Sequence, residues 1–182
     1  MGNPGSEYAG TRHNIGADVV VRLAGRHGGK LRFNRTARAL ADEVVVGGRR
    51  LALAFPQTYM NDSGVAVVPL VRRYGIDDLA RLVVVHDELD LPVGRIRVKA
   101  GGGLAGHNGL KSITAHLHSD GFTRVRVGIG KPAGRREGVD HVLGPPAKSE
   151  RKELDLAVEL AADAVEVILD EGVVSAQNRF NG

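Results

Sequence analysis

A chain of 182 residues with 42% hydrophobic content fits one globular domain, residues 1–182, with a buried core. Its net charge of +4 and sequence pI of about 9.7 are only weak evidence for a polyanionic partner. The lack of cysteine excludes disulfides and thiolate chemistry, and the lack of a leader or of an apolar run of roughly 20 residues predicts a cytoplasmic protein with no membrane partner.

The amino-terminal part predicts a tight turn followed by a helix. Asn3-Pro4-Gly5 is a strong turn signal. Ile15, Val19 and Leu23 then recur with helical spacing, which predicts an amphipathic helix over residues 15–26. His13 stands just before this helix, where its side chain can project into a cleft.

The next segment predicts a β-hairpin and a second helix. Two apolar runs, residues 40–46 and 51–55, flank a glycine pair, which is typical of a hairpin. A helix is expected over residues 63–74, capped by Asn61 or Asp62. Pro69 lies inside that helix, so we expect a kink or an early stop there.

The central segment, residues 82–111, combines a buried strand, a cationic strand and a glycine loop. Residues 82–85 form a short apolar run, and His86 and Asp87 follow at its carboxyl end, where open α/β sheets place their sites. Residues 95–99 alternate between cations and aliphatic residues, which predicts a strand. A glycine-rich loop, residues 101–109, leads into a helix over residues 110–117.

The second half adds one more strand and a long helix. Residues 122–129 read as a strand, residues 130–146 as a surface loop, residues 148–171 as an amphipathic helix and residues 178–180 as a docked tail. Strands alternate with helices along the chain. The predicted class is therefore α/β, a single domain with a mixed, mostly parallel sheet surrounded by helices.

Polar chemistry is concentrated in residues 3–14, 59–63 and 86–108, and turns at strand ends can bring these stretches together. A histidine with a carboxylate partner and asparagine amides, without a motif for a serine or cysteine nucleophile, favours a base that activates water. Five residues could be pictured as metal ligands, but their spacing matches no zinc motif, so we expect no metal: His13, His86, Asp87, Asp90 and His107. The glycine loop lacks the ending of a P-loop, so we expect no nucleotide cofactor.

Five cations on two predicted strands leave two interpretations open. Arg95, Arg97 and Lys99 would share one face of the first strand, and Arg124 and Arg126 one face of the second. They could form a surface that binds phosphate or simply a solvated face.

Together these residues resemble the bacterial peptidyl-tRNA hydrolase family. The matching motifs follow one another along nearly the whole chain, namely Gly2-Asn3-Pro4-Gly5-x-x-Tyr8, Thr11-Arg12-His13-Asn14-x-Gly16, Pro56-x-Thr58-x-Met60-Asn61-x-Ser63-Gly64, His86-Asp87-Glu88-Leu89-Asp90, Gly101-Gly102-Gly103-x-x-Gly106-His107-Asn108-Gly109-Leu110 and Arg126-x-Gly128-Ile129-Gly130. The resemblance implies a cytoplasmic, cofactor-independent enzyme that hydrolyses the ester between a peptide and the 3′ end of tRNA and so recycles tRNA from stalled translation.

The resemblance also implies roles for single residues. By this resemblance, His13 corresponds to the family's general base and Asp87 to the residue that orients it. The peptide and acceptor-end cleft would be lined by Asn3, Met60, Asn61 and Asn108, with Tyr8 as a contact on the tRNA side. Positions that hold tRNA phosphate correspond to Arg97, Lys99 and Arg126.

One departure from the family concerns the amino terminus. The family begins with an apolar strand that leads into the Asn-Pro-Gly turn, whereas Met1 stands here where that strand would end. We therefore expect the family's first strand to be missing, and a version extended upstream to be more stable. Two other functions stay open: an RNA-binding module that keeps the fold without the chemistry, and a metal-dependent hydrolase or peptidase. We expect a monomer.

Overall fold

The computed structural model describes residues 1–132 and 138–182, which form helices, short 3-10 helices and strands. The helices are α1 Ile15–Arg26, α2 Ser63–Arg73, α3 Asn108–Leu117, α4 Gly138–Leu143, α5 Lys148–Glu171 and α6 Val173–Phe180. The 3-10 helices are η1 Arg12–Asn14, η2 Met60–Asp62 and η3 Leu79–Arg81. The strands are β1 Arg32–Asn34, β2 Ala39–Val46, β3 Arg49–Pro56, β4 Val83–Glu88, β5 Ile96–Ala100 and β6 Thr123–Gly128.

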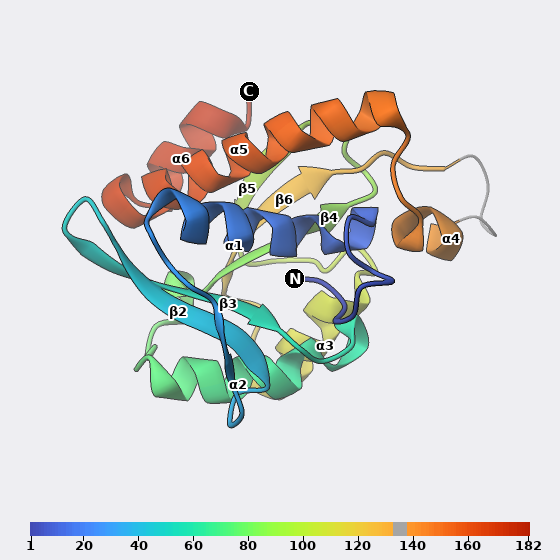
Figure 1. The fold of residues 1–182 in the computed structure, drawn as a ribbon. Helices are drawn as coiled ribbons and strands as arrows, with labels where there is room; N and C mark the ends of the chain where they lie inside the picture. Colours follow the sequence, from blue (N-terminus) through green and yellow to red (C-terminus); the bar gives the residue numbers. More distant parts are fainter. Residues whose placement is uncertain (133–137) are drawn as a thin grey trace.

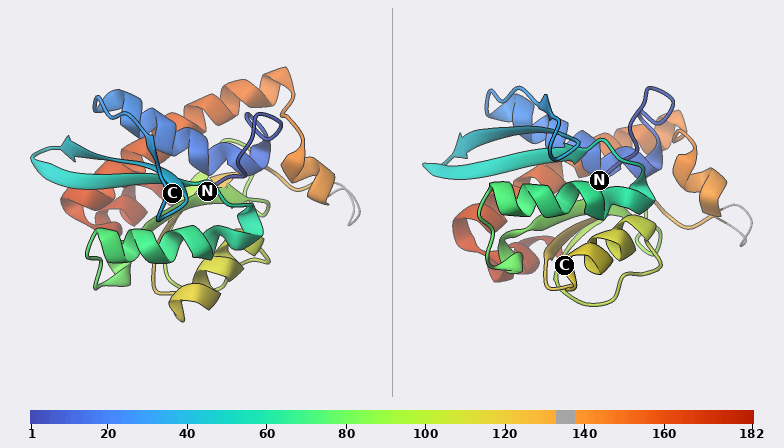
Figure 2. Two further views of the ribbon diagram at one scale, coloured as in Figure 1. Left: turned by 60° about the horizontal axis from the view of Figure 1, so that its bottom comes forward. Right: turned by 90° about the horizontal axis from the view of Figure 1, so that it is seen from below.

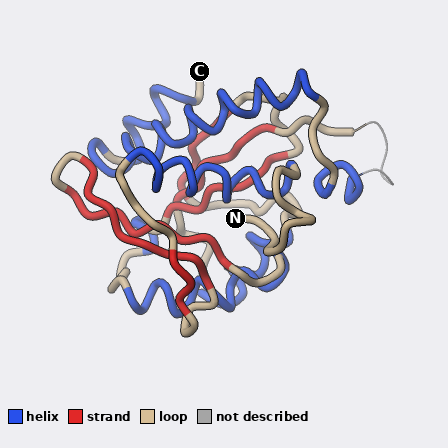
Figure 3. Tube along the Cα trace, viewed as in Figure 1, coloured by secondary structure: helices blue, strands red, loops and turns tan. Residues whose placement is uncertain are grey.

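These strands form two three-stranded sheets. One sheet has the order β1-β2-β3 and is antiparallel throughout. The other has the order β4-β6-β5, in which β4 and β6 run parallel while β5 and β6 run antiparallel. Figure 3 shows the β2–β3 hairpin extending away from the central sheet. The expectation of an α/β fold with a mixed sheet is thus confirmed.

The expectation of a mostly parallel sheet is not confirmed, and the connections explain why. A parallel pair needs a crossover of about a dozen residues or more, whereas short connections reverse the chain. Only residues 89–95 separate β4 from β5. Gly47 and Gly48 join β2 to β3, and both have positive φ, as a tight two-residue hairpin turn requires.

Helices cover both faces of the β4-β6-β5 sheet (Figure 1). The larger core lies between this sheet and helices α1 and α5, with Val85, Val125 and Val127 at its centre. A second core lies on the other face, where Val84 packs with Leu110 and Ile113 of α3. Figure 2 shows α2 and α3 lying together on that second side. Among the described residues, every helix is too short or too polar to cross a membrane.

Three local expectations need correction, and one strand was not expected. Residues 130–146 are not loop throughout, because α4 occupies Gly138–Leu143; residues 133–137 lie outside the described part. The expected tail at residues 178–180 belongs to helix α6, and β1 was not expected. The early stop at Pro69 is wrong, because α2 continues to Arg73 with Ala66, Val67 and Leu70 buried. Packing of this face outweighs the local cost of proline.

Met1 lies beside β4. Its nitrogen donates to Val85 O at 2.7 Å, and its carbonyl accepts from Ala17 N at 3.0 Å. The main chain therefore reaches the Asn-Pro-Gly turn from the edge of the central sheet. The expectation that the family's first strand is missing stays a prediction.

Candidate active site

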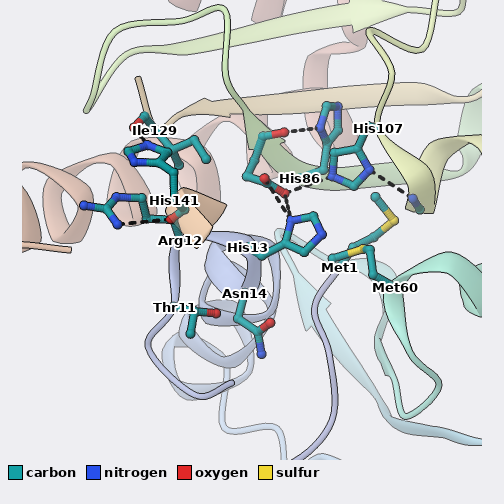
Figure 4. Close-up of polar contacts among 12 residues, drawn as sticks. Met1, Thr11, Arg12, His13, Asn14, Met60, His86, His107, Ile129 and His141 are labelled. Carbon is teal, nitrogen blue, oxygen red and sulfur yellow. Dashed lines mark hydrogen bonds and ion pairs between the residues drawn. The ribbon is translucent and has the colours of Figure 1, made fainter. Parts of the chain in front are cut away.

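His13 and Asp87 meet although 74 positions separate them. His13 belongs to η1, directly before α1, and Asp87 lies near the carboxyl end of β4. Nδ1 of His13 lies 2.9 Å from each carboxylate oxygen of Asp87 (Figure 4). The Asp87 side chain is 3% exposed and the His13 side chain 14%. In the described part of the chain, Nε2 of His13 has no hydrogen-bond partner.

The residues on either side of His13 hold its main chain in place. Arg12 donates to both carboxylate oxygens of Glu150, at 2.8 Å for the shorter contact, and to three carbonyls around α4. Asn14 Oδ1 accepts from Asn3 N at 2.8 Å, and Asn14 Nδ2 donates to Asn3 O at 2.9 Å. A Cβ at Gly16 would lie 2.2 Å from Val85 O, so only glycine lets α1 approach β4 this closely.

His107 is a second donor to Asp87, and the sequence did not predict this contact. Its Nε2 lies 2.9 Å from Asp87 Oδ1. Its Nδ1 accepts from Gly109 N at 3.1 Å and Leu110 N at 3.4 Å, which caps the first turn of α3. A nitrogen that accepts carries no proton in the neutral ring, so the proton of His107 resides on Nε2. The signal that could have revealed this role was a polar residue three positions before the predicted helix, which in the structure begins at Asn108.

The charge of Asp87 is stabilised by these two histidines. Burial alone would raise the pKa of the carboxyl, but the hydrogen bonds from His107 and His13 outweigh burial and hold its pKa well below the usual range. Asp87 therefore remains ionised at neutral pH. It accepts Nδ1–H of His13, which leaves the lone pair of His13 on Nε2.

His86 lies behind this group and takes no part in the contact with the carboxylate. Its side chain is fully buried, and Nδ1 lies 2.7 Å from Asp87 O while Nε2 has no partner. Its ring packs edge-on against His107 at a centroid distance of 5.0 Å. Burial, and then the nearby His107, lower the pKa of His86 to about 3.

The buried His86 predicts an acid-labile fold. The unfolded state takes up this proton near pH 6.5 and the folded state only near pH 3, so the proton binds the unfolded state preferentially between these values. We expect this residue to lower the free energy of unfolding by about 1.4 kcal/mol per pH unit as the pH falls from 6.5 towards 3. Urea unfolding of wild type and His86→Phe at several pH values measures the difference. Equal pH slopes for the two proteins would disprove the assignment.

The expected cleft residues gather near this group. Asn3 is buried, and its Oδ1 accepts from Met60 N at 2.7 Å, which joins the first turn to η2. Nδ2 of Asn3 has no hydrogen-bond partner in the described part of the chain. Met60 is buried, whereas Asn61 and Asn108 are exposed at the start of η2 and of α3.

Tyr8 is half-buried and packs edge-on against Tyr59, with ring centroids 6.4 Å apart. Tyr59 is an exposed aromatic residue directly before Met60, and sequence reasoning did not single it out. A pair of aromatic rings thus joins the same two segments as the Asn3–Met60 contact.

The expected cations divide into an outward group and a buried residue. Arg97 is exposed and Lys99 half-buried on β5, and Arg97 stands opposite Arg126 of β6. Arg126 is also paired with Glu88, at 3.0 Å. Arg124 does not belong to a solvated or phosphate-binding face, because its side chain is buried beneath the glycine loop.

An ionised buried carboxylate that holds an imidazole, on an α/β scaffold, is the kind of site found in hydrolases that use a histidine as base. The comparisons with known proteins give the family. A family model described as peptidyl-tRNA hydrolase matches residues 1–182. The chain belongs to the peptidyl-tRNA hydrolase family.

Individual relatives agree with this assignment. The chain is 51% identical over 181 residues to a peptidyl-tRNA hydrolase of Rhodococcus erythropolis, covering 100% of this chain and 95% of the relative. It is 48% identical to one of Leifsonia xyli, covering 100% and 94%. A crystal structure of peptidyl-tRNA hydrolase from Acinetobacter baumannii superposes with a TM-score of 0.94 at 39% identity, covering 100% of this chain and 91% of that chain.

Proposed function

We propose that this protein hydrolyses the ester bond between a peptide, or an N-blocked aminoacyl group, and the 3′ end of tRNA. The products are free tRNA and free peptide, so the reaction recycles tRNA from stalled or aborted translation. The observation that carries the proposal is the 2.9 Å contact of His13 Nδ1 with Asp87 in a chain of this family. We further propose that residues 1–182 act as one domain, as a monomer, in the cytoplasm.

His13 acts as the general base and Asp87 as its orienting partner. Nε2 of His13 takes a proton from water as the water oxygen attacks the ester carbonyl. The imidazolium that forms donates Nδ1–H to the ionised Asp87, which stabilises its charge. The proton that Nε2 took from water then passes to the 3′ oxygen of the ribose as that oxygen leaves. His107 also donates to Oδ1 of Asp87, so two imidazoles restrain the carboxylate.

The asparagine side chains select and position the acyl group. Asn3 Nδ2 and the side-chain amides of Asn61 and Asn108 can donate to carbonyl oxygens, and Oδ1 of Asn61 or Asn108 can accept from the first peptide N–H. A free amino acid would present an ammonium group to these neutral amides and find no anionic partner. Met60 supplies an apolar wall, and Tyr8 supports the side of the cleft that faces tRNA.

A turnover assay tests this function. N-acetyl-aminoacyl-tRNA and unblocked aminoacyl-tRNA are incubated with the wild-type protein, and released amino acid is measured against a reaction without enzyme. We expect cleavage of the blocked substrate and little cleavage of the unblocked one. Tight tRNA binding without turnover would instead support an RNA-binding module.

We also propose that the reaction needs no metal. The possible ligand atoms of His13, Asp87 and His107 lie within 4.8 Å of one another. However, the main-chain amides at Nδ1 put the proton of His107 on Nε2, so the nitrogen that faces Asp87 has no lone pair for a metal. We expect full turnover in the presence of excess EDTA. Loss of activity that added Zn²⁺ restores would contradict this proposal.

Arg97, Lys99 and Arg126 are proposed to hold tRNA phosphates. Phosphate contacts add affinity without sequence preference, which suits an enzyme that accepts many tRNAs. Because Glu88 pairs with Arg126, that guanidinium is already fixed on this face of the sheet before RNA binds.

Arg97→Gln and Lys99→Gln should each weaken tRNA binding and reduce the slope of log K against log salt by about 1. We expect the same effect on different tRNAs and little change in kcat. The matched control is Arg50→Gln, which removes an exposed arginine from the β2–β3 hairpin. Salt slopes equal to wild type for both variants would remove these cations from the interface.

A further inference from the structure

The loop that carries His107 and Asn108 contains few main-chain restraints of its own. Gly101, Gly102 and Gly106 have positive φ, and so does Ala105 at 48°. Such backbone conformations are reached easily by glycine, and glycine also widens the range of loop conformations. Within the loop, His107 N donates to Leu104 O at 2.9 Å, and Leu104 packs against the second core. The first part of the loop needs a restraint from outside.

Arg124 of β6 supplies that restraint. Its side chain, 2% exposed, donates through one terminal nitrogen to Gly103 O at 2.6 Å and through the other to Gly102 O. The guanidinium also lies over the ring of Phe122, at 5.2 Å from the centroid. No carboxylate in the described residues forms an ion pair with Arg124.

Burial of the Arg124 guanidinium lowers the stability of the fold. A buried guanidinium remains charged, and here it donates to two carbonyls, lies over an aromatic ring and is influenced by Asp120 and Glu88 only from beyond ion-pair distance. A buried aliphatic side chain would fill the same space without that cost. The planar fork of arginine, however, can bind two successive carbonyls at once, which the single ammonium of lysine cannot do.

We propose that Arg124 is a positioning residue, which fixes the glycine loop so that His107 reaches Asp87 and Asn108 faces the cleft. The path is short: Arg124 holds Gly102 and Gly103, the turn from Leu104 to His107 follows, and His107 Nε2 ends on Asp87 Oδ1. This inference rests on the proposed roles of Asp87 and Asn108. It also takes Arg124 out of the group of phosphate-binding cations.

Steady-state kinetics of Arg124→Lys and Arg124→Gln test the proposal. Because a displacement of about 1 Å at a site can cost about 100-fold in rate, we expect kcat to fall about 10- to 100-fold in both variants. KM and its salt dependence should stay close to wild type. A rise in KM with unchanged kcat, together with a smaller salt slope, would overturn the proposal, because Arg124 would then be a phosphate ligand. Arg50→Lys is the matched control.

A second variant perturbs the same contact from the loop. Gly102 is exposed and has φ of 85°, so Gly102→Ala strains the loop and leaves Arg124 intact. We expect a similar loss of kcat with a melting temperature near that of wild type. Two results would show that Arg124 is only a structural residue. One is a wild-type kcat in Gly102→Ala, and the other is a loss of kcat in the Arg124 variants that matches their unfolded fraction.

A measurement without substrate separates this proposal from the catalytic one. Hydrogen exchange of the Gly109 and Leu110 amides reports whether His107 caps α3. We expect exchange at both amides to become at least about tenfold faster in Arg124→Lys, with unchanged exchange in β6 and α5. Unchanged exchange at Gly109 and Leu110 would overturn the proposal even if His13 proves to be the base. Faster exchange would support the proposal for Arg124 even if His13 proves not to be the base.

Discussion

His13→Ala should abolish most ester cleavage while tRNA binding survives. Of the two imidazoles that contact the Asp87 carboxylate, only that of His13 has a second nitrogen without a partner in the described part of the chain, since His107 uses both of its ring nitrogens. Removal of a general base of this kind costs about 10²- to 10⁴-fold in kcat. Single-turnover cleavage of N-acetyl-aminoacyl-tRNA, with binding measured separately, checks the effect.

His27→Ala is the matched control for this variant. His27 directly follows α1, and its ring contacts Glu166 far from Asp87. It should retain wild-type kcat. If His13→Ala keeps more than about a tenth of the wild-type kcat, another group activates water and the assignment of His13 as base is wrong.

Asp87→Asn should have an effect as large as that of His13→Ala. An amide at this position loses the charge that stabilises the imidazolium. Its oxygen can accept from one of the two histidines, but its NH₂ group is a donor and cannot accept from the other. His13 can then adopt the wrong tautomer, with its proton on Nε2, and a comparable substitution in a catalytic triad costs about 10⁴-fold. We expect kcat to fall about 10³- to 10⁴-fold with KM nearly unchanged.

Asp90→Asn provides the comparison for Asp87→Asn. Asp90 lies just beyond β4 and pairs with Lys131 at the surface. Its replacement should leave kcat within about twofold of wild type, as is usual for an exposed pair. Equal losses in both variants would indicate a general effect of negative charge near the cleft and would remove the special role of Asp87.

The long elements were predictable because their patterns are local. The bounds of α1 and α5 agree with the sequence prediction, since the buried stripes along each helix repeat with helical spacing. Strands β5 and β6 were predicted to within one residue at each end, whereas β4 continues three residues beyond the expected end, through Glu88. In β5 the alternation itself decides the faces, with Ile96 and Val98 buried and Arg97 exposed.

The short elements and the strand directions depend on contacts that the sequence does not display. Helix α4 has few residues, and it is held by Arg12, which donates to His141 O and Gly144 O. Helix α6 packs on β5 and α5, where Ala176 is buried. Around α4 the composition is rich in glycine, proline and charge, and α6 is a short segment near the end of the chain, so neither local pattern reveals such partners.

At the site, the family resemblance predicted the pair His13 and Asp87, and the structure brings them together. It did not predict that Asp87 would have two histidine donors. A histidine after a glycine loop could be a cap, a ligand or a surface residue, and only its distance to Asp87 in the structure shows that His107 donates to that carboxylate. For Arg124 the sequence was misleading, because alternation in a strand does not show which face a loop covers.

The histidine tautomers of the free protein test the central claim most directly. Long-range ¹H–¹⁵N correlation spectra of ¹⁵N-histidine-labelled protein at neutral pH distinguish a proton on Nδ1 from one on Nε2. The account predicts that neutral His13 carries its proton on Nδ1 and His107 on Nε2, both directed at Asp87. A His13 ring protonated on Nε2 would have no lone pair for water and would contradict the proposed mechanism.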